Sequence, residues 1–148
     1  MLSNRTFIIN QQGIGFAQGK AREIRLAVFV KEQEIPMKLE IDDLDERSWH
    51  FVLIKNNQPV STARVFEEGK KELHIGRVAT LKEFRKQGLA GGIFLEIEKF
   101  AKLNNFSKLV LDAQLTAKSF YEKINYIPEG EIFLDADIEH VRMTKEII

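Results

Sequence analysis

A strand-like segment, a glycine-containing turn and a long helix-like segment follow one another between residues 73 and 103. The run 73–80 has the composition of a strand, and apolar residues recur at helical spacing from Leu89 onward. A second strand-like run, 108–113, comes directly after the helix. The helix therefore crosses from one strand to the next, which is how parallel strands are connected. No other feature constrains the fold of this chain as strongly.

The remaining segments predict a mixed chain. Two strand-like runs flank residues 55–59, whose asparagines and proline favour a hairpin turn. The predicted strands are 7–9, 49–54, 60–66, 73–80, 108–113, 127–134 and 140–144, and the predicted helices are 21–31, 89–103 and 117–124. Consecutive strands with a single crossover predict an α+β fold, in which a mostly antiparallel central sheet contains one parallel pair and is flanked by helices.

Two segments lack a clear periodicity and are predicted to be loops. Three glycines interrupt residues 13–20, which we interpret as flexible. Residues 34–47 are rich in acids. In the helix between these two segments, Arg22 and Arg25 occupy polar positions.

Length and composition limit the functional classes. A chain of 148 residues fits one domain, which we assign to residues 1–148. Lys and Arg number 22, as do Asp and Glu, so no basic excess favours a nucleic-acid partner. No apolar run could cross a bilayer and the first residues do not resemble a secretion signal, which favours the cytoplasm without a membrane partner. Without cysteine there are neither disulfides nor thiolate ligands, and we expect no metal.

Two glycine-containing segments could hold a phosphate group. In residues 13–20, Gly13 lies one residue too far from Gly19 for a P-loop, and Gln18 stands where a dinucleotide fingerprint has its third glycine. Residues 85–92 follow a strand and open a helix, so their backbone N–H groups point outward beside basic side chains. This second turn predicts a site for an anionic, phosphate-bearing ligand, although the same sequence could serve as a plain helix cap.

The turn also carries a family resemblance. The run Arg85-Lys86-Gln87-Gly88-Leu89-Ala90 matches Arg/Gln-x-x-Gly-x-Gly/Ala, the signature of the GNAT superfamily of acetyl-CoA-dependent N-acetyltransferases. Residues 117–126 resemble the family's later Ala-x-x-Phe-Tyr-x-x-x-Gly-Phe segment, with Asn125 in place of the usual glycine. Asparagine also tolerates the left-handed conformation at a helix end. The resemblance covers most of the chain, and residues 25–33 and 137–143 are similar to a small bacterial subgroup whose substrate is generally unassigned.

The resemblance implies a site for acetyl-CoA as cosubstrate. The backbone amides after Arg85 and the helix N-terminus would hold the pyrophosphate, with the charges of Arg85 and Lys86 nearby. In this family the pantetheine arm pairs like an extra strand with the strand that carries Val78 and Thr80, and the Val78 N–H would polarise the acetyl carbonyl. The residues implied in cofactor binding are Val78, Thr80, Arg85, Lys86, Gln87, Gly88, Leu89, Ala90, Gly91 and Ser119.

The resemblance also implies direct transfer of the acetyl group to an amine, which needs a base for the ammonium and an acid for the departing thiolate. Tyr121 occupies the position of the family's sulfur-protonating tyrosine, although it could be a core aromatic instead. His74 lies where some members carry a glutamate base, and an imidazole can accept a proton near neutrality. A structural histidine is the alternative, and His50 or His140 could also face the acceptor pocket.

The acceptor is predicted to be a primary amine of a small molecule or of a protein. Acids between residues 32 and 45 could attract such a cation, or could form an ordinary solvated loop. Trp49 could belong to the core or line the acceptor pocket. A homodimer is a further expected assembly. The alternative function is a coenzyme A-binding sensor without turnover, and a generic interaction domain would bind no coenzyme A.

Overall fold

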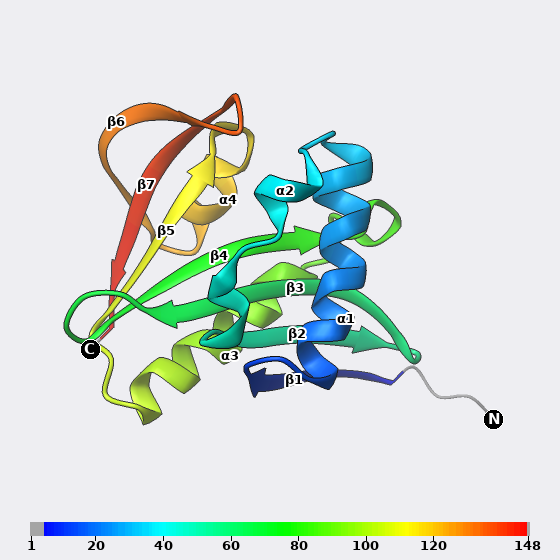
Figure 1. The fold of residues 1–148 in the computed structure, drawn as a ribbon. Coiled ribbons are helices and arrows are strands. Elements are labelled where there is room, and N and C mark those ends of the chain that lie inside the picture. Colours follow the sequence, from blue (N-terminus) through cyan, green and yellow to red (C-terminus); the bar gives the residue numbers. More distant parts are fainter. Residues whose placement is uncertain (1–4, 148) are drawn as a thin grey trace.

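The computed structural model describes residues 5–147, which form a seven-stranded sheet with helices on both faces (Figure 1). The strands are β1 (Thr6–Gln12), β2 (Trp49–Lys55), β3 (Gln58–Glu67), β4 (Glu72–Thr80), β5 (Lys108–Gln114), β6 (Ile127–Asp135) and β7 (Ile138–Glu146). The helices are α1 (Phe16–Arg25), its π-helical continuation (Leu26–Glu32), α2 (Met37–Glu40), α3 (Leu89–Leu103) and α4 (Lys118–Lys123). Short 3-10 turns lie at Asp43–Glu46, Lys82–Phe84 and Leu115–Ala117. Within residues 5–147, every helix falls short of the length and apolar character that a membrane span requires.

The strand order is β1-β2-β3-β4-β5-β7-β6, and the predicted α+β fold is confirmed. Strands β4 and β5 pair in parallel, joined by the α3 crossover, while the other strand pairs of the described sheet are antiparallel. The predicted β2–β3 hairpin also forms. Its two turn residues, Asn56 and Asn57, have φ values of 49° and 68°, the left-handed conformation that a tight hairpin turn needs.

The predicted loop over residues 13–20 is wrong in its second half, because α1 begins at Phe16. The helical face from Ala17 to Ile24 is fully buried against β2 and β3. Burial of this apolar stripe outweighs the cost of about 1 kcal/mol for placing Gly19 inside a helix. The helix predicted over residues 21–31 is confirmed, although its last part is π-helical rather than α-helical.

The predicted acidic loop is also wrong, because residues 34–47 contain α2 and a 3-10 turn rather than an irregular solvated segment. The acids of this segment contact arginines of other elements. Arg25, which the sequence predicts at a polar position of the helix, is only 1% exposed and binds two carboxylates. We call the group Arg25, Arg64, Arg77, Glu40, Asp42 and Asp45 the charge cluster.

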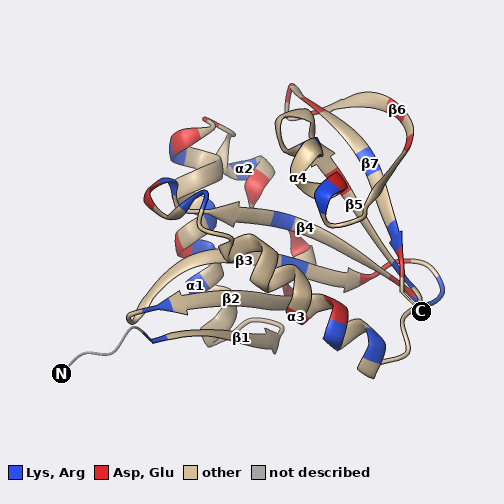
Figure 2. Ribbon diagram, turned by 180° about the vertical axis from the view of Figure 1, so that it is seen from behind, with Lys and Arg blue, Asp and Glu red and all other residues tan. Residues whose placement is uncertain are grey.

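Two apolar cores lie on opposite faces of the sheet. The larger one joins α3 and α4 to the strands and contains Phe94, Ile97 and Tyr121. The smaller one lies under α1 and its π-helical continuation and contains Ile24 and Val28. Figure 2, drawn from behind, shows α3 crossing the face of the sheet that Figure 1 leaves in the background. Both faces of the central strands are therefore covered by apolar cores. A ligand could reach the central strands only where they separate or end.

Candidate functional site

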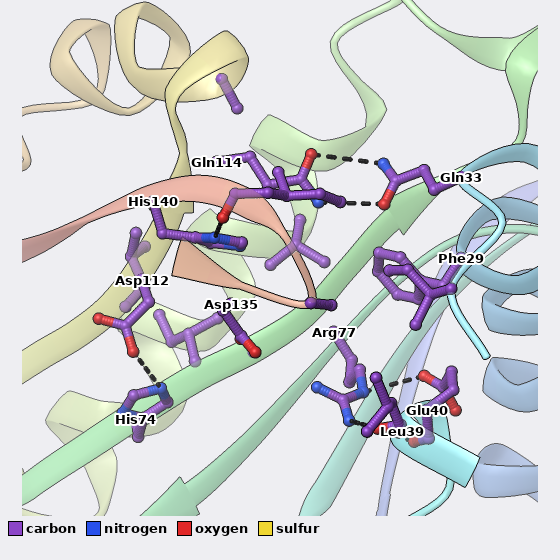
Figure 3. A pocket seen from close by; sticks show the side chains of 18 of the residues that line it. Phe29, Gln33, Leu39, Glu40, His74, Arg77, Asp112, Gln114, Asp135 and His140 are labelled. Atoms are coloured by element: carbon purple, nitrogen blue, oxygen red, sulfur yellow. Dashed lines mark hydrogen bonds and ion pairs between the residues drawn. The ribbon is translucent and has the colours of Figure 1, made fainter. Parts of the chain in front are cut away.

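Strands β4 and β5 separate midway along their length and leave an opening in the sheet. Their parallel pairing runs from Glu72 and Lys108 only as far as Ile75 and Leu111, although both strands continue beyond those residues. A cavity of about 430 Å³ opens at this point, between the two strands, the π-helical segment, α2 and the β6–β7 turn (Figure 3). The second half of β4, residues 76–80, thus has one edge paired with β3 and one edge facing the cavity.

A β-bulge lies in this exposed half of β4. Gly76 pairs with Arg64 and Ala79 pairs with Thr62, so two residues of β4 face one residue of β3. The extra residue gives the Arg77 backbone a φ of 50°, an uncommon conformation for residues other than glycine or asparagine. A bulge redirects the backbone groups beside it. Val78 follows directly and lines the cavity, so the redirected backbone belongs to the cavity wall.

The charge cluster holds the bulge and α2 together. Arg77 forms an ion pair with Glu40 at 2.9 Å and donates to the Leu39 and Glu40 carbonyl oxygens and to Asp42. Glu40 is 2% exposed and also accepts two hydrogen bonds from Arg25. These contacts fix the strained φ of Arg77 and place α2 as a wall of the cavity.

Burial opposes ionisation of Asp45, which has Arg25 and Arg64 on its two sides. The hydrogen bond from Gln18 and the two guanidinium groups outweigh that effect and hold the pKa of the Asp45 carboxyl far below its usual range. The pKa of Asp42 is lowered as well, because hydrogen bonds and charge from Arg64 exceed the cost of burial. Asp42 and Asp45 therefore stay ionised at neutral pH. The cluster as a whole joins three arginines and three acids by ion pairs.

The predicted phosphate turn leads into a helix end without a side-chain cap. Lys86 and Gly88 adopt positive φ values of 63° and 77°, and Gly88 is the N-cap of α3 without a side-chain cap. The first described helical hydrogen bond of α3 runs from the Gly92 N–H to the Gly88 carbonyl, so the amides of Leu89, Ala90 and Gly91 precede it. A Cβ added at Gly88 would meet no atom within 4 Å. The space beside the Gly88 backbone is therefore open.

Arg85 makes contacts that its sequence position did not predict. Its guanidinium forms a bidentate pair with Glu32 at 2.6 Å and also donates to the Thr80 carbonyl. The hydrogen bond to Glu32 raises the pKa of Arg85. Arg85 thereby links the end of the π-helical segment to the end of β4. Lys86 is exposed at the turn, while the Gln87 side-chain oxygen accepts from Lys55.

Tyr121 lies in α4 and lines the cavity. Its side chain is 6% exposed, packed edge-on against Phe94 and Phe120, and burial raises the pKa of its hydroxyl. The phenol therefore keeps its proton throughout the physiological range. Ser119, two residues earlier, is exposed on α4 and is not among the residues that line the cavity.

His74 lines the same cavity from the paired half of β4. Its Nδ1 lies 3.0 Å from a Glu68 carboxylate oxygen, and its Nε2 lies 3.9 Å from Asp112. Its ring stacks on Phe66 with centroids 5.0 Å apart. A carboxylate at Nδ1 favours the tautomer that carries the proton there, which leaves Nε2 as the basic nitrogen toward Asp112 and the cavity.

The other candidates divide into cavity and core residues. His50 is fully buried, with its Nε2 2.9 Å from the Asp45 carbonyl, and it does not line the cavity. Trp49 packs on Phe100 beside the larger core and does not line the cavity, which agrees with the core alternative. His140 does line the cavity and stacks on Phe133.

Several cavity residues were missed from the sequence. Gln33 and Gln114 exchange two side-chain hydrogen bonds, of 3.3 Å and 3.1 Å, across the cavity (Figure 3). They lie 81 positions apart, so no local pattern connects them. Asp135 lies at the end of β6, directly before the short turn to β7. A carboxylate at that position was the only sequence signal that could have pointed to it as a cavity residue.

Known proteins resemble this chain in both sequence and fold. The family described as acetyltransferase (GNAT) domain matches residues 10–147. A Bacillus subtilis protein named uncharacterized N-acetyltransferase YjcF is 39% identical over 126 residues, which cover 83% of this chain and 88% of that protein. Escherichia coli ElaA superposes with a TM-score of 0.83 at 25% identity, over 95% of this chain and 99% of that one. An acyl-CoA N-acyltransferase from Pseudomonas aeruginosa has the same fold, with a TM-score of 0.82 at 23% identity and coverage of 97% and 99%.

Proposed function

The chain belongs to the GNAT family of acetyl-CoA-dependent N-acetyltransferases, and on this basis we propose that it moves an acetyl group from acetyl-CoA to a primary amine by direct attack. The observation that carries the proposal is the separation of β4 and β5 beside an uncapped α3 N-terminus. These two features would hold the thioester and the phosphates of one extended ligand.

The N-terminus of α3 is the proposed pyrophosphate site. The amides of Leu89, Ala90 and Gly91 precede the first helical hydrogen bond, and the partial positive charge of a 15-residue helix adds to their attraction for an anion. The open space at Gly88 supports the fit, because a phosphate must approach this backbone closely. Exposed Lys86 would add full charge, whereas Arg85, already paired with Glu32, would hold the turn in place.

The cavity-facing edge of β4 is the proposed site of the pantetheine arm. Residues 76–80 are not paired with another strand on this edge, so an amide-containing chain could pair there as an additional strand would. The bulge at Arg77 turns the next backbone unit. The Val78 N–H would then donate to the acetyl carbonyl and stabilise the negative charge that develops there.

Tyr121 and His74 are the proposed acid and base. The buried, protonated Tyr121 hydroxyl would donate its proton to the departing thiolate. His74 Nε2 would accept the proton of the attacking ammonium, directly or through water, while Glu68 holds the Nδ1 proton. Both residues line the one cavity that the exposed edge of β4 borders.

Substitution of Gly88 by leucine tests the cofactor site against a matched control. Gly88 and Gly130 both have positive φ, 77° and 83°, and at both a Cβ would meet open space. Leucine should therefore strain the two positions alike, by about 1–2 kcal/mol. Only Gly88→Leu places a side chain over the proposed phosphate site, so we expect it to abolish acetyl-CoA binding measured by calorimetry while Gly130→Leu binds normally. Equal affinities in the two folded variants would contradict the proposed site.

A further inference from the structure

Most polar side chains that line the cavity already form hydrogen bonds or ion pairs with protein groups. Arg77 is paired with Glu40 and Asp42, and the Gln33 and Gln114 amides bind each other. Asp112 is paired with Arg142 at 3.0 Å. These groups shape the wall but offer little unused hydrogen-bonding capacity to a ligand.

Asp135 differs from them. It is the cavity-lining carboxylate for which residues 5–147 provide no ion pair, and Figure 3 shows it on the opposite side of the cavity from Phe29. Tyr121 adds a hydroxyl that is buried, lines the same cavity and has no described hydrogen-bond partner. Besides the imidazoles of His74 and His140, which also line the cavity, the groups left open to a ligand are therefore an anion and a neutral hydroxyl.

The cavity wall lacks a free guanidinium or ammonium group among the described residues. Arg77 is its one arginine or lysine, and its guanidinium is already shared by two carboxylates. A ligand carboxylate would have no guanidinium or ammonium to bind and would also be repelled by Asp135. The opposite wall is apolar, with Phe29, Ile35 and Leu39 lining it. Such a wall favours a hydrocarbon or aromatic group over a charged one.

We infer that the acceptor is a cationic amine with an apolar body and no carboxylate beside the amine, so that free amino acids are discriminated against. This inference rests on the proposed function and narrows its substrate class. Asp135 attracts the ammonium into the cavity, and the Phe29 wall contacts the apolar body.

Three ligands separate the parts of the inference. Phenethylamine and phenylalanine share a ring and an amine and differ by the carboxylate, while ethylamine keeps the charge without the ring. Each is titrated calorimetrically into protein already saturated with coenzyme A. We expect phenethylamine to bind about tenfold more tightly than phenylalanine, because the amino acid buries an unpaired carboxylate. Ethylamine should also bind more weakly than phenethylamine.

The variant Asp135→Asn tests the carboxylate, with Asp137→Asn as its control. Asp137 lies in the same turn and is exposed, as Asp135 is, but it does not line the cavity. Asparagine tolerates its φ of 62°. We expect Asp135→Asn to weaken phenethylamine binding about threefold, the range of a partly exposed ion pair, and Asp137→Asn to have no effect.

The outcomes distinguish this inference from the proposed function. Phenylalanine binding as tightly as phenethylamine would overturn the inference, and so would equal effects of the two aspartate variants. Ethylamine binding as tightly as phenethylamine would overturn the role of the apolar wall. Coenzyme A binding without binding of any of the three ligands would overturn the inference and leave the cofactor site standing. Absence of coenzyme A binding in the first stage would overturn the proposed function itself.

Discussion

Arg25 and Arg22 lie three residues apart on α1 and should respond very differently to the same substitution. Arg25 is 1% exposed and donates to the carboxylates of Glu40 and Asp45, with four contacts between 2.9 and 3.1 Å. Arg22 is exposed and has no described ion pair within residues 5–147. Methionine preserves much of the aliphatic stem in both places and removes only the charge.

The expected cost at Arg25 follows from the balance of the charge cluster. Arg25→Met leaves three buried or half-buried acids with two arginines, Arg64 and Arg77. Removing one partner from a buried ion pair costs about 3–5 kcal/mol of unfolding free energy. For a chain of this length, that corresponds to a fall in the melting temperature of about 6–20 °C. Arg22→Met should change the unfolding free energy by about 0.5 kcal/mol or less.

Urea denaturation at pH 7, followed by circular dichroism, measures both variants against the unchanged protein. The slope of the free energy against urea should stay the same in all three, since that slope reports the surface exposed on unfolding. A loss of less than about 1 kcal/mol for Arg25→Met, or a loss equal to that of Arg22→Met, would refute the account of the charge cluster as the support of α2 and the β4 bulge.

Two further predictions concern the acid of the reaction and the pH dependence of stability. Tyr121→Phe should lower turnover by about 10²-fold and leave acetyl-CoA affinity unchanged, because only a proton donor is lost. The control is Tyr126→Phe, which also removes a buried hydroxyl but lies outside the cavity lining and should leave turnover unchanged. Equal effects of the two substitutions would assign Tyr121 to the core. Burial lowers the pKa of His50, so between its folded pKa and the unfolded value of about 6.5 only the unfolded chain binds the proton. The contribution of neutral His50 to the unfolding free energy should therefore be complete above pH 6.5 and decrease as the pH drops below it. His50→Gln should remove most of the slope of the unfolding free energy against pH between pH 7 and 5. An unchanged slope in urea titrations would contradict the account of His50.

The parts of the fold that could be predicted are those in which neighbouring residues determine the structure. The crossover of α3 between β4 and β5 follows from periodicity alone, and Asn56-Asn57 specify their own turn. The start of α1 and the form of residues 34–47 depend instead on distant partners. Arg25 looks like Arg22 in sequence, and only the approach of Glu40 and Asp45 from another segment makes it a buried residue.

The candidate site also has one part that could be predicted from neighbouring residues and one part that depends on distant residues. Residues 85–91 form one continuous segment whose glycine and basic residues can be recognised directly, and the structure places them at an uncapped helix end. The cavity is assembled from the π-helical segment, α2, β4, β5, α4 and the β6–β7 turn. Asp135 and the Gln33–Gln114 pair meet there only because the fold brings β5, β6 and the end of the π-helical segment together, so no sequence spacing marks them.

Calorimetric titration of acetyl-CoA into the protein, followed in the same sample by thiol release on addition of phenethylamine, tests the central claim most directly. The account predicts saturable binding with one acetyl-CoA per chain, and release of coenzyme A thiol that depends on the amine. Absence of acetyl-CoA binding would contradict the assignment of the α3 N-terminus and the open edge of β4 as a cofactor site. Binding without thiol release, for this amine and other primary amines, would contradict catalysis and leave a protein that only holds coenzyme A.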